Sequence, residues 1–274
     1  MSMTRIIKPS GCVEHPHQKG IAGELDWARA KFISKRRLFM ETGSTYLGFG
    51  WIILDPLILS VVYLFVFTVI RHDEDPTALF IGLGMIRGMQ RSLSSMSNPK
   101  MDLKGGLNID RVSTRAVGIS LVLYLVVTTL LSGLGVAAVL LFLGAPIVGA
   151  LVFIAALLVN NLFWYAVGLN ALSLTTKMPD LHKFTSYFGT GMFFFSPVLF
   201  TIEATSGWHR TASAYNPLSY FLEISRKVAI GEDYGGLDIL PRMGFIVLLT
   251  LMITMIWRGN KRLDDIRWRM SNRS

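Results

Sequence analysis

Two arginines in a largely apolar stretch are the residues of this sequence whose types and spacing best suit chemistry. Arg87 and Arg91 lie four residues apart, and together with Gly84 and Gly88 they fall within about 100° of one another on a helical wheel. Small residues four positions apart let helices pack closely, so this face is predicted to point into protein. A guanidinium there keeps its charge, and it must therefore contact carbonyl groups, water, a carboxylate or a bound anion.

Asp55 lies in the preceding apolar stretch, at about the same predicted depth as Arg91 when both stretches are read as helices that cross a bilayer in opposite directions. One interpretation is a structural ion pair between Asp55 and Arg91. The other is a cationic pathway for an anionic substrate such as a phosphate. No carboxylate is predicted at the depth of Arg87, which makes Arg87 the better pathway candidate.

Motifs for catalysis and for cofactor binding are missing from the sequence. It contains no G-x-x-x-x-G-K-[ST] phosphate loop, no H-E-x-x-H zinc motif and no G-x-S-x-G nucleophile motif. An acidic run at 73–75 could serve a metal-assisted transferase, but three adjacent acids in a short loop are more often solvated. Cys12, His15 and His17 offer three metal ligands in a polar tail without a fourth. We therefore predict no catalytic residue, no metal site and no cofactor on this chain.

The composition predicts an all-α integral membrane protein. Hydrophobic residues make up 51% of the 274 residues, charged residues make up 16%, and the mean hydropathy is +0.47. A soluble domain has about 25% charged residues, so a compact soluble enzyme is disfavoured. A mixed stretch at 203–240 is predicted to form short re-entrant or interfacial helices on the outer side before the last span. Six apolar segments have a length near the ~20 residues that cross a bilayer: 48–70, 77–96, 116–143, 147–174, 184–202 and 241–257.

One transmembrane domain is predicted at 24–257, between a flexible cytoplasmic tail at 1–23 and a basic cytoplasmic tail at 258–274. Its first part, 24–42, has the pattern of a basic amphipathic helix in the membrane interface. With the N-terminus inside, the inner segments hold 20 Lys and Arg residues and the outer segments hold five. The positive-inside rule then places both termini in the cytoplasm, and the net charge of +9 requires no nucleic acid partner.

Four basic residues of this amphipathic helix lie at the predicted level of the inner leaflet: Lys31, Lys35, Arg36 and Arg37. A pyrophosphate would suit them, because its two adjacent anionic centres match the fixed donor fork of arginine. The positive-inside effect also accounts for much of this charge, so both interpretations stay open. Aromatic residues in the spans are likewise open to two interpretations, which are helix packing and stacking on sugar rings.

Three stretches resemble motifs of the permease subunits of polysaccharide-export ABC transporters, of the O-antigen and teichoic-acid type. The stretch at 42–67 is similar to the first-span signature of that family, FFFSPVLF at 193–200 to its fifth-span segment, and NPLSYFLEISR at 216–226 to its outer Asn-Pro-Leu segment. The resemblance covers about residues 24–260. The matching residues that we single out are Ser44, Gly48, Trp51, Pro56, Ser196, Pro197, Asn216, Pro217 and Arg226.

The resemblance implies a six-span subunit that dimerises with a second copy of itself and couples to two copies of a separate ATPase, which would bind ATP and Mg. Its cargo would be a polysaccharide on a polyprenyl-pyrophosphate lipid, moved from the cytoplasmic to the outer side of the plasma (inner) membrane. Membrane lipids are further expected partners. The ATPase would dock on Leu107, Asn108, Ile109, Asp110 and Arg111, although this stretch could also be a plain basic loop.

The sequence departs from the family pattern at two places, and two other functions stay open. The first outer loop is short, and Arg87 stands near a position where the family commonly carries an aromatic residue. A permease of the same fold could export a drug or an ordinary lipid. A membrane-embedded glycosyl or phospholipid transferase would need a cluster of carboxylates, and Asp55 is the one carboxylate within a predicted span.

Overall fold

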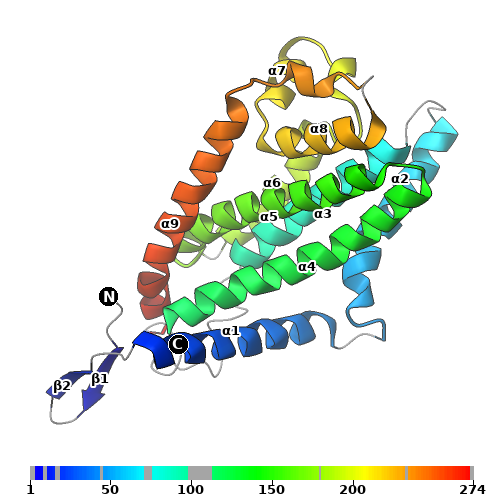
Figure 1. The fold of residues 1–274 in the computed structure, drawn as a ribbon. Helices are drawn as coiled ribbons and strands as arrows, with labels where there is room; N and C mark the ends of the chain where they lie inside the picture. Colours follow the sequence, from blue (N-terminus) through cyan, green and yellow to red (C-terminus); the bar gives the residue numbers. More distant parts are fainter. Residues whose placement is uncertain are drawn as a thin grey trace.

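The computed structural model describes residues 4–8, 11–15, 19–43, 46–70, 76–97, 113–178, 180–231 and 234–271. Apart from one small hairpin, the regular elements in these ranges are helices (Figure 1). In chain order they are β1 (Thr4–Lys8), β2 (Gly11–His15), α1 (Lys19–Thr42), α2 (Gly50–Ile70), α3 (Pro76–Ser97), α4 (Thr114–Phe142), α5 (Ile147–Thr175), α6 (Leu181–Phe195), η1 (Ile202–Ala204), α7 (Gly207–Ala214), α8 (Pro217–Ile230), η2 (Gly236–Ile239) and α9 (Gly244–Ser271).

Helices α2, α3, α4 and α5 coincide closely with the first four predicted spans. Within the described ranges, α4 and α5 are the two helices that are long and apolar enough to cross a membrane, and Gly50–Val66 in α2 is a shorter apolar helix. The helical architecture is therefore confirmed, while the crossing of all six segments stays a prediction.

The fifth predicted span differs from the structure. Helix α6 has 15 residues and ends at Phe195, whereas the predicted span extends to residue 202. A helix of that length covers about 22 Å, which is less than the ~30 Å of a hydrocarbon core. Ser196 has extended backbone angles, φ −96° and ψ 151°, as expected for a residue that precedes a proline. Pro197 therefore ends the helix, and the chain continues in irregular form to η1.

The two ends of the chain also carry more regular structure than the sequence predicts. Strands β1 and β2 pair as an antiparallel hairpin within the segment 1–23, where a flexible tail is predicted. Helix α1 begins at Lys19, before the predicted start of the interfacial helix at residue 24. Helix α9 runs on to Ser271, so the predicted basic tail 258–274 is largely the continuation of the last helix.

The core lies where α3 packs against α5, and glycines set the close approach of these two helices. A Cβ atom on Gly88 would lie 2.4 Å from Asn161 Oδ1, and one on Gly84 would lie 3.1 Å from the ring of Phe153. The glycine face of α3 therefore points into protein, as the sequence predicts. Buried amides join three helices at this level, since Asn161 donates to Thr129 on α4 at 2.8 Å and Asn160 donates to the Met85 carbonyl on α3 at 3.2 Å.

Helix α1 and the pair α7–α8 lie at opposite ends of the bundle (Figure 1). The hairpin and the last turns of α9 lie at the α1 end. Helix α1 is fastened to α4, because Ser113 donates to Asp26 at 2.6 Å and the Tyr124 hydroxyl donates to Glu41. The protein thus has one end built around α1 and another built around α8.

Candidate functional site

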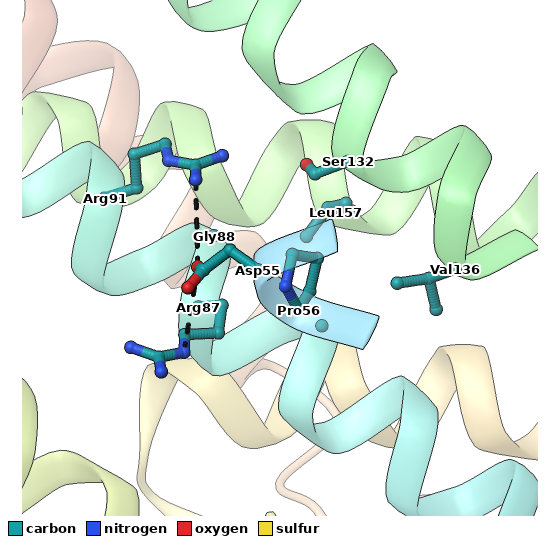
Figure 2. Close-up of a pocket in the computed structure, with 9 residues that line it drawn as sticks. Asp55, Pro56, Arg87, Gly88, Arg91, Ser132, Val136 and Leu157 are labelled. Carbon is teal, nitrogen blue, oxygen red and sulfur yellow. Dashed lines mark ion pairs between the residues drawn. The ribbon is translucent and has the colours of Figure 1, made fainter. Parts of the chain in front are cut away.

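A cluster of one carboxylate and two guanidinium groups lies between α2 and α3. Asp55 Oδ2 lies 3.7 Å from Arg91 Nη2 and 3.9 Å from Arg87 Nε. The two guanidinium groups lie on opposite sides of the carboxylate (Figure 2). The cluster opens into a pocket whose lining is completed by residues of α2, α3, α4 and α5: Pro56, Gly84, Gly88, Ser132, Val136 and Leu157.

The position of Arg87 corrects the sequence analysis. Depth along the helices pairs Asp55 with Arg91, and the structure has these two side chains within ion-pair distance. The prediction that no carboxylate reaches Arg87 is wrong, because Asp55 lies between the two arginines. A long arginine side chain spans the height of one helical turn, about 5.4 Å, which the depth argument neglects.

The part of α3 that is not packed against other helices is polar. After Pro76, every α3 residue with more than slight exposure is polar, and these residues recur at helical spacing: Arg87, Gln90, Arg91, Ser94 and Ser95. We call this set the α3 polar stripe. Gln90 holds it to α6, because it accepts from Arg87 at 3.4 Å and donates to the Gly189 carbonyl at 3.1 Å. A polar stripe of this kind is a poor surface for lipid tails, so it suits a protein interface or a path for polar cargo.

Arg226 organises the α8 end of the bundle and is 1% exposed. Its guanidinium donates to the Pro197 carbonyl at 2.7 Å, to the Val198 carbonyl at 2.9 Å and to the Phe200 carbonyl at 3.2 Å. It also donates to the carbonyl of Ala78, in the first turn of α3, at 3.0 Å. One side chain of α8 therefore binds the irregular segment after α6 and the start of α3 together.

Neighbouring residues complete this arrangement. Asn216 donates to the Ser196 hydroxyl at 2.8 Å, and its side-chain oxygen caps α8 by accepting from the Leu218 amide at 3.0 Å. Pro217 occupies the first turn of α8, where no amide donor is needed. Gly82 allows the close approach, because a Cβ atom there would lie 2.4 Å from the Val198 carbonyl oxygen.

Glu223 belongs to the same buried cluster and is not among the site residues that the sequence predicts. Glu223 is 0% exposed, lies 3.4 Å from Arg226 Nη1, and accepts from the Tyr234 hydroxyl at 2.5 Å. Burial raises the pKa of Glu223 above its ordinary value, against the opposing effects of Arg226 and Tyr234. The sequence places both residues in the mixed outer stretch 203–240. Their spacing of three residues permits an ion pair on one face of a helix, which is the one sequence signal of this pairing.

Comparison with known protein families identifies the family of this chain. Residues 31–230, well over half of the chain, match the family described as ABC-2 type transporter. The chain belongs to this family. It is thus an ABC permease, the transmembrane component of an ABC exporter rather than a catalytic enzyme, and the family implies an ABC ATPase as its partner. No curated protein matches the sequence.

The basic residues of α1 in this ABC-2 permease divide into two groups. Lys31, Lys35 and Arg36 are exposed, and they form the basic surface that the sequence predicts. Arg37 differs, because it is 3% exposed and donates to the Ser95 carbonyl on α3 at 2.7 Å, with its guanidinium 4.5 Å from the centre of the Tyr124 ring. Arg37 therefore joins α1 to α3 and α4, and it is not part of this exposed basic surface.

The remaining predicted residues of the permease lie near α2 or outside the described ranges. Gly48 has φ +48°, a backbone conformation that favours glycine, in the turn between α1 and α2. Trp51 is 43% exposed, and Pro56 lies inside α2, where its carbonyl accepts from Ser60 at 2.7 Å. Ser44 and the stretch 107–111 lie outside the described residues. In the part of the chain that the structure describes, no three His, Cys, Asp or Glu side chains gather as a metal site.

Proposed function

We propose that this permease exports a polysaccharide linked to polyprenyl pyrophosphate, from the cytoplasmic to the outer side of the plasma (inner) membrane. It acts as a dimer with two copies of a separate ATPase, which bind ATP and Mg. Both termini lie in the cytoplasm. The stretch Leu107 to Arg111 docks on the ATPase, and the helices α7 and α8 cover the outer end.

The observation that carries the proposal is the α3 polar stripe. A transmembrane helix whose exposed face holds two arginines, a glutamine and two serines suits a hydrophilic, anionic cargo better than an apolar drug. The neighbouring helix α6 exposes Phe184, Tyr187 and Phe188, which are 65%, 74% and 40% exposed. Flat aromatic faces of this kind can stack on sugar rings, so the two helices together fit a charged glycan.

The exposed basic face of α1 supports the same cargo at the inner leaflet. Lys31, Lys35 and Arg36 lie on the helix that is fastened to the start of α4. Each basic residue near an anionic surface contributes about 1 kcal/mol of attraction. Such a face would collect the pyrophosphate head group before the cargo reaches the α3 polar stripe.

Stimulation of the ATPase by substrate tests the proposal. The permease and its ATPase, reconstituted in nanodiscs, should hydrolyse ATP faster with polyprenyl-pyrophosphate-linked glycan than with phosphatidylethanolamine or an apolar dye. Replacing Lys31, Lys35 and Arg36 by glutamine should raise the half-saturating glycan concentration by about tenfold, if each contributes near half of its expected attraction. Stimulation by the dye or by the phospholipid alone would instead support export of a drug or an ordinary lipid.

A further inference from the structure

We propose that Arg87 and Arg91 form an intramembrane binding site for a pyrophosphate group, and that Asp55 occupies the place of the anion in this structure. The site would exchange one oxyanion for another, with the carboxylate of Asp55 leaving as the cargo head group arrives. The assignment of that anion to the cargo rests on the proposed function, whereas the binding of pyrophosphate can be tested by itself.

The geometry of the two arginines points to a single shared oxyanion. Both guanidinium groups face the same atom, Asp55 Oδ2, from opposite sides, at 3.7 Å and 3.9 Å (Figure 2). Arginine binds carboxylate and phosphate oxygens alike, so two guanidinium groups on either side of one carboxylate oxygen also suit a phosphate. Gly84 and Gly88, on the same helix, line the same pocket as the two arginines.

Asp55 holds this place loosely. Charge-assisted hydrogen bonds between a guanidinium and a carboxylate are about 2.7–2.9 Å long, and both distances here are longer. Within the described chain, Arg87 Nε is buried and makes no hydrogen bond. The side chain of Asp55 is 43% exposed, so the rest of the described chain does not enclose the carboxylate. A buried donor without an acceptor and a counter-ion held at long distance together favour an exchangeable site.

The charges favour a ligand with more than one negative charge. Asp55 is the one carboxylate within ion-pair distance of either arginine in the described ranges, so the cluster carries a net charge of about +1 at neutral pH. A pyrophosphate brings at least two charges and two adjacent sets of oxygens, one for each guanidinium. Gln90 keeps Arg87 directed along α3, because it accepts from Arg87 and is itself held by the Gly189 carbonyl of α6.

Exchange at this site would also act on the helices. Asp55 belongs to α2 and the two arginines belong to α3, so the ion pairs join these two helices. When an anion replaces the carboxylate, that charged link is lost, and α2 becomes freer to move relative to α3. Arrival of the head group would thus be linked to a change in the helix pair that borders the pocket.

Direct binding of inorganic pyrophosphate to the full chain tests the site. The protein is placed in nanodiscs of phosphatidylcholine, and bound radiolabelled pyrophosphate is measured by equilibrium dialysis. Asp55→Asn should strengthen binding about fivefold, since it removes a competitor held by two partly exposed ion pairs. The double variant Arg87→Gln with Arg91→Gln should weaken binding by at least about tenfold.

A matched control removes the same charge elsewhere on the described chain. Arg115 and Lys177 are both exposed, and changing both to glutamine should leave pyrophosphate affinity within about twofold of the wild type. Unchanged or weaker binding by Asp55→Asn, or loss of its folded form in gel filtration, would make Asp55 a structural counter-ion and overturn the exchange. Wild-type affinity in the double arginine variant would overturn the site itself.

Competition in the same nanodiscs identifies the source of the phosphate. Polyprenyl pyrophosphate should displace the labelled pyrophosphate at a lower concentration than phosphatidylglycerol or inorganic phosphate. Equal displacement by phosphatidylglycerol would overturn the assignment to the cargo head group. If the proposed function alone is wrong, the result is different. The permease would then export no glycan, but it would still bind pyrophosphate, and Asp55→Asn would still raise that affinity.

Discussion

Replacing Arg226 by leucine is expected to destabilise the permease severely, although the residue lies far from the α3 polar stripe. Leucine keeps an apolar body in the site but offers no donor to the irregular segment after α6. The carbonyls of Pro197, Val198 and Phe200, together with that of Ala78, would each lose the guanidinium that they now share. The buried carboxylate of Glu223 would lose its ion pair with Arg226. The hydrogen bond from the Tyr234 hydroxyl would remain.

The size of the effect follows from these contacts. A buried acceptor left without a donor costs about 1–3 kcal/mol, so four carbonyls together give a loss of about 4 kcal/mol at the lower limit. Breaking a buried ion pair by removing one partner costs about 3–5 kcal/mol, which includes part of the same loss. Since folded proteins are stable by only about 5–15 kcal/mol, most of the stability would be lost. At about 2–4 °C per kcal/mol, the unfolding midpoint should fall by about 10 °C or more.

Thermal unfolding of the purified chain in nanodiscs measures this effect. Arg210→Gln is the matched control, because Arg210 is exposed on α7 at the same end of the bundle. It should leave the midpoint almost unchanged. Adding Glu223→Gln to Arg226→Leu should recover the part of the loss that comes from the unpaired carboxylate. If Arg226→Leu unfolded at the same temperature as the Arg210 control, the account of Arg226 as the organising residue of this end would be refuted.

Three further predictions concern other parts of the chain. Gly82→Ala should lower the unfolding midpoint, because a Cβ atom there would lie 2.4 Å from the Val198 carbonyl oxygen. Gly191→Ala should not, because a Cβ atom there meets nothing within 4 Å, and equal midpoints for the two variants would contradict this. Alanine at Asp110 and Arg111 should uncouple ATP hydrolysis from transport without loss of membrane insertion, and unchanged transport in vesicles would remove the docking role. Because the pKa of Glu223 is raised in the folded protein, its protonation stabilises the fold at low pH and this gain is lost as the pH rises through that raised value. The unfolding midpoint of the wild type should therefore rise relative to that of Glu223→Gln from neutral to mildly acidic pH, and parallel curves would contradict the assignment.

Much of the fold could be predicted from the sequence because the apolar runs have helix lengths. The limits of α2 to α5 follow from where those runs start and stop, and helix depth alone brings Asp55 to the level of Arg91. Backbone height did not place Arg87 beside Asp55, because the long arginine side chain reaches across about one helical turn. The predicted fifth span runs past Pro197, because the apolar run continues beyond the proline that ends α6.

The buried charges at the α8 end could not be predicted by the same means. Arg226 and Glu223 lie in a mixed stretch, for which composition predicts short re-entrant or interfacial helices but not which side chains are buried. Their burial depends on the chain folding back onto the irregular segment after α6, which is a contact between distant parts of the sequence. The burial of Arg37 could not be predicted for a similar reason. Only the packing of α1 on α4 decides which basic residues of α1 are buried and which are exposed.

The most direct test of the central claim is transport itself. The permease and its ATPase are reconstituted in liposomes with the ATPase outside, and movement of a labelled polyprenyl-pyrophosphate-linked glycan to the interior is measured by its protection from an added glycosidase. The account predicts protection that needs ATP and Mg, that is absent with an ATPase unable to hydrolyse ATP, and that is slowed by Arg87→Gln. ATP-driven movement of a labelled phospholipid or an apolar dye, with the glycan left fully open to the glycosidase, would contradict it.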